Sequence, residues 1–83
     1  MVFDYSKLLG RIKEKGFTQE TLAKHIGITP GVMSEKMNNR TPFKQREMFA
    51  ICEALDIPIA DIGEYFFALK VRETRTNEVT ANA

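Results

Sequence analysis

The sequence has one cysteine and one histidine among its 83 residues, and these shortages exclude several classes of site. Because Cys52 has no second cysteine, an internal disulfide is impossible, and a cytosolic protein is favoured. His25 is the lone histidine, so a cysteine–histidine metal cluster is excluded, and no glycine-rich phosphate loop is present. The helical pattern places Cys52 on an inward face and His25 on a flank, which argues against a nucleophile–base pair. We therefore expect no enzyme, no metal and no cofactor.

Long apolar runs are also missing. The run Met48 to Cys52 is far too short to cross a bilayer, and no signal peptide is visible, so we expect a cytoplasmic protein. Hydrophobic residues are 43% and charged residues 28% of the chain, as in folded globular domains. The length allows one core. We expect one domain over residues 1–71 and a disordered tail over residues 72–83, where periodicity ends.

The net charge of +1 conceals an uneven distribution. Residues 1–50 carry nine basic and five acidic side chains, whereas residues 51–83 carry three basic and six acidic ones. A positive surplus suits a polyanionic partner such as DNA. Small domains with ordinary solvated surfaces show similar imbalances, so this feature alone does not decide the function.

Apolar residues recur at helical spacing in successive segments, each bounded by residues that start or stop helices. They predict helices over about 4–15, 18–26, 30–37, 44–55 and 59–64. The segment 65–71 is ambiguous, because an extended backbone would also place alternate apolar side chains on one face. We predict a compact all-α domain of five helices, with a short C-terminal strand as the alternative for that segment.

The most specific pattern is a helix–turn–helix. Ala23 lets two helices approach closely, Gly27 turns the chain with a positive φ, and Met33 fills the space beneath the second helix. Thr18 and Thr29 are suited to cap the two helices. A second helix held out from a small domain in this way can enter the major groove of DNA.

These residues resemble the phage Cro/CI-type (XRE-like) helix–turn–helix repressors, and in particular the small regulators of Gram-positive phages. The resemblance covers residues 4–67 and is carried by segments 17–23, 27–29, 33–39, 57–58 and 62–66. It implies a lambda-repressor-like fold in a phage or prophage protein of a bacterial host cell. It also implies a sequence-specific transcriptional regulator that inserts helix 30–37 into an operator as a homodimer.

The third helix departs from the family at one position. Many members have a bulky apolar residue three positions after Met33, where this chain has Lys36, so we expect Met37 to take over the packing. With Met33 and Met37 facing inward, Glu35 points away from the core. Because the resemblance implies base readout at the start of this helix, we expect base contacts from Pro30, Gly31, Val32 and Glu35.

Phosphate contacts are expected around the rim of this surface. Gln19 resembles the phosphate-contacting glutamine of the family. Contacts of this kind set affinity and salt dependence rather than sequence choice, and each residue is equally compatible with a solvated surface. The other expected donors are Ser34, Lys36, Asn38, Asn39, Arg40, Lys44 and Gln45.

A second reading is a protein-binding module. A helix–turn–helix can bind another regulator, as an antirepressor or modulator does, and the recognition helix has few polar side chains on a nearly neutral chain. Such a protein would act on a partner repressor rather than on DNA. For the segment 65–71, two arrangements remain open, because it can pair with its twin as an edge strand or fold onto its own core.

Overall fold

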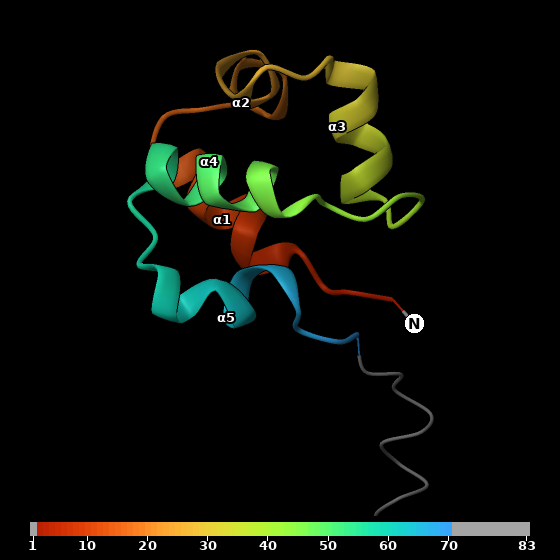
Figure 1. The fold of residues 1–83 in the computed structure, drawn as a ribbon, viewed down its shortest axis with the longest axis vertical. Coiled ribbons are helices and arrows are strands. Elements are labelled where there is room, and N and C mark those ends of the chain that lie inside the picture. The colour runs from red at the N-terminus through yellow and green to blue at the C-terminus, as the bar shows by residue number, and fades with distance from the viewer. Residues whose placement is uncertain (1, 71–83) are drawn as a thin grey trace, which may run out of the picture.

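A computed structural model describes residues 2–70, and these residues form five α-helices and one 3₁₀-helix (Figure 1). The all-α, five-helix prediction is confirmed. The predicted disordered tail over residues 72–83 lies outside the described residues. The elements are α1 (Ser6–Glu14), α2 (Gln19–Ile26), α3 (Pro30–Met37), α4 (Gln45–Leu55), η1 (Ile59–Asp61) and α5 (Ile62–Phe66).

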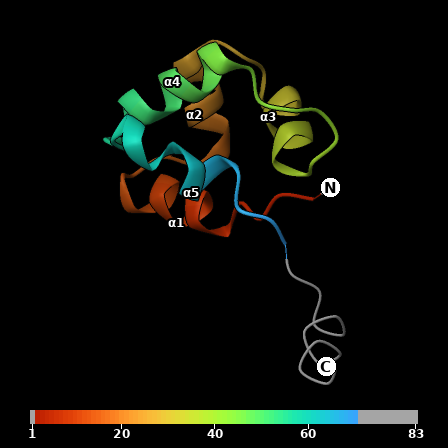
Figure 2. The ribbon, with the colours of Figure 1, turned by 60° about the horizontal axis from the view of Figure 1, so that its bottom comes forward.

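The core collects the apolar side chains that recur on the inward faces of the helices. Leu8, Leu22, Met33, Ile51 and Leu55 are fully shielded from solvent, one or two from each of the first four α-helices. Burying one such side chain stabilises the fold by roughly 1.5–3 kcal/mol. The core therefore holds α1, α2 and α4 together, and α3 joins it at the edge of the helical body (Figures 1 and 2). None of the described helices is long and apolar enough to cross a membrane.

The two ends of the described chain lie side by side. Phe3 and Leu69 form an isolated antiparallel bridge, in which the Asp4 N–H donates to the Ala68 carbonyl and the Lys70 N–H donates to the Val2 carbonyl. Tyr65 and Phe66 belong to α5, so the described part of this segment, residues 65–70, does not form one long strand. Within residues 2–70 the bridge is the only extended pairing.

The start of α1 differs slightly from the prediction. The first helix was expected to begin near residue 4, but α1 begins at Ser6 and the N-cap position is Tyr5. The Asp4 carboxylate still accepts hydrogen bonds from the N–H and the hydroxyl of Ser6. These two bonds hold the pKa of the Asp4 carboxyl below its usual value. The extended residues before α1 are thereby free to pair with the C-terminal segment.

Candidate functional site

The helix–turn–helix forms as its sequence predicts. Thr18 caps α2 by accepting from the Thr21 N–H at 3.0 Å, and Thr29 caps α3 by accepting from the Val32 N–H at 3.1 Å. Gly27 ends α2 with a φ of 87°, a conformation that glycine adopts without strain. These local features bring α3 across the end of α2 and leave one side of α3 facing solvent.

The outward side of α3 contains all four expected base-contacting residues. Pro30, Gly31, Val32 and Glu35 are exposed, and Glu35 points away from the core as predicted. A Cβ added at Gly31 would meet nothing within 4 Å, so this part of the surface is open. These four residues are mostly apolar and include one carboxylate, that of Glu35. Whether these residues contact bases stays a prediction.

Lys36 is not on the exposed rim, and the expectation that it is a solvent-facing donor is wrong. Its side chain is only 5% exposed, and its Nζ lies 3.1 Å from Oε1 of Glu47, whose side chain is 3% exposed. The same Nζ donates to the Pro42 carbonyl at 2.9 Å. Lys36 therefore takes the inward position beside Met33 that Met37 was expected to occupy, whereas Met37 is only partly buried.

The buried ion pair joins α3 to the start of α4. Besides the Lys36 ammonium, Oε1 of Glu47 accepts a hydrogen bond from the Lys44 N–H at 2.8 Å, as in a capping box. Burial raises the pKa of the Glu47 carboxyl. The hydrogen bond from the Lys44 N–H and the nearby Lys36 ammonium together lower this pKa by more than burial raises it, so the net shift is downward. Glu47 therefore stays ionised and fixes the rotation of α3 against α4.

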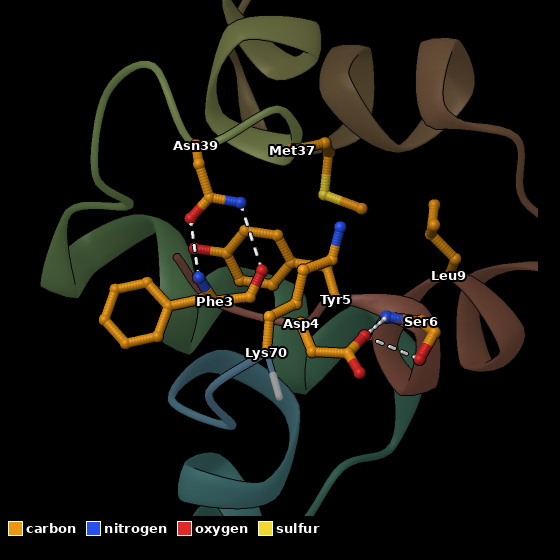
Figure 3. Close-up of a pocket in the computed structure, with 8 residues that line it drawn as sticks. All are labelled: Phe3, Asp4, Tyr5, Ser6, Leu9, Met37, Asn39 and Lys70. Carbon is orange, nitrogen blue, oxygen red and sulfur yellow. Dashed lines mark hydrogen bonds between the residues drawn. The ribbon is translucent and has the colours of Figure 1, made fainter. Parts of the chain in front are cut away.

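Asn39 is also used within the protein. It has a left-handed backbone with a φ of 64°, and its carboxamide accepts from the Phe3 N–H at 2.8 Å and donates to the Phe3 carbonyl at 3.0 Å (Figure 3). The neighbouring Asn38 donates to the Ser34 carbonyl at 2.8 Å. Both asparagines were expected to contact phosphate, and the Asn39 carboxamide is already engaged at both ends.

The remaining rim residues are exposed. Arg40 and Lys44 take part in no ion pair within residues 2–70, so their charges remain available to a partner. Contacts with phosphate stay a prediction for this set, which consists of Gln19, Ser34, Asn38, Arg40, Lys44 and Gln45.

A shallow pocket of about 210 Å³ lies between the start of α1 and the end of α3 (Figure 3). No sequence pattern predicts this pocket, because its walls come from three separate segments. Apolar atoms of Tyr5, Leu9 and Met37 line it, and Lys70 extends over it from the C-terminal segment. It could accept one side chain of a protein partner, but the lining offers no cluster of catalytic groups.

The two residues considered for catalysis occupy ordinary structural positions. Cys52 is buried in the core, and burial raises the pKa of its thiol, so the thiol stays protonated. His25 is exposed on α2, where its ring lies 5.4 Å from the Phe17 ring, centroid to centroid. Within residues 2–70 no group of three or more histidine, cysteine or acidic side chains could hold a metal.

Known proteins resemble this chain over nearly its whole folded length. A family model described as a protein of unknown function (DUF739) matches residues 1–69. The chain is also similar to the solution structure of the modulator of repression (MOR) of the temperate bacteriophage TP901-1 from Lactococcus lactis. The TM-score is 0.71 and the sequence identity 38%, over 87% of this chain and 97% of that chain. No curated protein matches.

Proposed function

This chain belongs to the DUF739 family, and we propose that it modulates repression by binding a partner repressor. The observation that carries the proposal is the exposed face of α3, where Glu35 is the only ionised side chain. The one lysine of this helix, Lys36, is buried in an ion pair. The proposal is supported by a relative with 38% identity that is by name a modulator of repression.

A helix that enters the major groove passes between two rows of phosphates. Each lysine or arginine near those phosphates adds affinity, whereas a carboxylate is repelled. On α3, Glu35 is the charged side chain that would face the groove, and no basic side chain of this helix is exposed. Arg40 and Lys44, which form no ion pair within residues 2–70, follow the C-terminal end of the helix. The whole chain has a net charge of only +1. Strong binding to DNA by this chain alone is therefore disfavoured.

The same face suits a protein. Val32 is 38% exposed and offers apolar contact area beside the open surface at Gly31. A basic side chain of the repressor can pair with Glu35. When such a pair is buried at an interface, removing either side chain leaves the other charge buried without a partner, so binding depends on both residues. Apolar contact at Val32 and a charge pair at Glu35 would together give the partner both contact area and a fixed orientation.

The proposal is tested by calorimetric titration of this protein with a purified repressor from the same genome. We expect Val32→Asp and Glu35→Arg each to weaken binding by about tenfold or more, because each removes a contact at the centre of the interface. Glu53→Arg is the matched control, since Glu53 is an exposed acid on α4 with no ion pair in residues 2–70. If Val32→Asp and Glu35→Arg bind the repressor as tightly as wild type and Glu53→Arg do, the proposed surface is refuted.

Direct operator binding is the second candidate function, and the geometry of the capped helix–turn–helix favours it. In this case a homodimer would read a palindromic site through the outward face of α3, and Arg40 and Lys44 would contact phosphate. A gel shift with the upstream DNA, with and without the repressor, separates the two candidates. A sequence-specific shift by this protein alone, weakened by Arg40→Ala and by added salt, would establish DNA binding.

A further inference from the structure

We infer that two copies of this chain associate through the paired end segments, residues 2–4 and 68–70, which we term the terminal ribbon. Leu69 of one copy pairs with Leu69 of the second copy, and the two ribbons form one four-stranded antiparallel arrangement. The inference does not depend on which regulator or DNA the α3 face binds. It rests on the direction in which the backbone groups of Phe3 and Leu69 point.

The hydrogen bonds of the ribbon determine that direction. The Asp4 N–H donates to the Ala68 carbonyl at 2.6 Å and the Lys70 N–H donates to the Val2 carbonyl at 2.9 Å. These bonds flank the bridge between Phe3 and Leu69, so those two residues form a pair that exchanges no hydrogen bond. In such a pair the N–H and C=O groups of both residues point outward, away from each other.

The outward groups of Phe3 already have a partner. The Asn39 carboxamide accepts from the Phe3 N–H at 2.8 Å and donates to the Phe3 carbonyl at 3.0 Å, as an adjacent strand would (Figure 3). This edge of the ribbon is therefore closed. Further strands cannot add beside Phe3 without displacing Asn39.

The opposite edge is open. Among residues 2–70, no group forms a hydrogen bond with the N–H or the carbonyl of Leu69. Leu69 is 53% exposed, and Phe67, whose ring packs edge-on against Phe3 with 5.8 Å between centroids, is 50% exposed. In Figure 1 the C-terminal segment lies on the side of the N-terminal segment that faces away from α3. An unpaired edge with exposed apolar side chains is a template for another strand.

A second copy fits this edge in a self-complementary register. With Leu69 opposite Leu69 of the second copy, a two-fold axis passes between them, and their outward N–H and C=O groups exchange two hydrogen bonds. Lys70 then lies opposite Ala68 of the second copy, so no like charges face each other. Because Asn39 closes the outer edge in each copy, assembly stops at two chains. The contact is small, so the dimer exchanges with the monomer.

Sedimentation equilibrium of the full chain over a concentration series tests the inference, together with hydrogen exchange of the Leu69 amide. We expect a monomer–dimer equilibrium and protection of this amide that grows with concentration up to about 1 mM. Leu69→Pro removes the outward N–H and leaves both donors within the ribbon, the N–H groups of Asp4 and Lys70, in place. Leu69→Lys is the second variant, because it places two lysines opposite each other at the axis.

Both variants should raise the dimer dissociation constant by about tenfold or more. Circular dichroism checks that both variants stay folded. If Leu69→Pro does not fold, the sedimentation of Leu69→Lys alone decides the test. Phe49→Lys is the matched control, because Phe49 is an exposed apolar residue on α4 away from the ribbon, and its dimer should persist. A monomer at every concentration, or dimers that both Leu69 variants leave intact, would overturn the inference.

Discussion

The two faces of α3 differ in how far the rest of the protein constrains them. On the inner face Met33 is fully buried, and the Lys36 ammonium is held by Glu47 in a pair shielded from solvent. On the outer face Val32 and Glu35 are exposed, and neither forms an ion pair within residues 2–70. One helix therefore combines a strongly anchored side with an unconstrained one.

This difference separates stability from recognition. A buried ion pair gives little net stability but tolerates few geometries, so it fixes how α3 is rotated on α4. The outer residues then keep a defined orientation although nothing holds their side chains. Substitutions on the inner face should change the unfolding free energy, whereas those on the outer face should change partner binding.

The largest effect is expected when the inner face loses one charge. Glu47→Ala leaves the Lys36 ammonium buried with only the Pro42 carbonyl as an acceptor, so unfolding should become easier by about 3–5 kcal/mol. Urea titration followed by circular dichroism measures the change. The matched control is Glu53→Ala on the exposed side of α4, which should change stability by less than about 0.5 kcal/mol.

Replacing both charges separates the cost of an unpaired ion from the value of the pair. The double variant Lys36→Met, Glu47→Leu should recover most of the stability lost in Glu47→Ala, because no buried charge is left without a partner. If the double variant is as unstable as Glu47→Ala, shape rather than charge controls this contact.

A smaller effect is expected where α3 ends. Asn39→Gly keeps the left-handed backbone but removes both bonds to Phe3, which should lower stability by about 1–2 kcal/mol. Asn39→Ala should lower it by roughly a further 1 kcal/mol, because a φ of 64° is unfavourable for alanine. Urea midpoints of the two variants give this difference. Equal midpoints would show that the backbone conformation is not a source of strain.

The pH dependence tests the same buried pair without disrupting the packing. The pKa of Glu47 in the folded protein lies below its usual value of 4.5, so its stabilising contribution is complete above that pH. The contribution is lost as the pH falls through the lowered pKa. Wild-type protein should therefore lose stability below about pH 4.5 more steeply than Glu47→Gln. Asp4 and Asp56, whose pKa values are also lowered, are present in both proteins and cancel.

Much of the helix–turn–helix could be predicted because its signals are local. Thr18 and Thr29 bond to N–H groups three residues away, and Gly27 adopts a conformation that few other residues favour. The buried position of Met33 follows from helical spacing. The five-helix architecture could be predicted for the same reason.

The inner face of α3 could not be predicted in full because its partners are distant in sequence. Asn39 bonds to a residue 36 positions earlier, and a donor of this type at a helix end is equally suited to phosphate. Lys36 was expected on the rim, with Met37 facing inward, because a lysine inside the protein needs a partner and only the tertiary structure brings Glu47 to it. A charged side chain on an apolar face was the available signal.

The smallest change in stability is expected on the outer face. Val32→Asp and Glu35→Arg, the variants that should weaken repressor binding, should shift the unfolding free energy by no more than about 0.5 kcal/mol. Urea titration of both proteins beside wild type measures this, and their binding titrations then report on the interface alone. A loss above about 1 kcal/mol for Val32→Asp would mean that the outer face also supports the fold. The separation of stability from recognition would then fail at the residue where the proposed interface is most apolar.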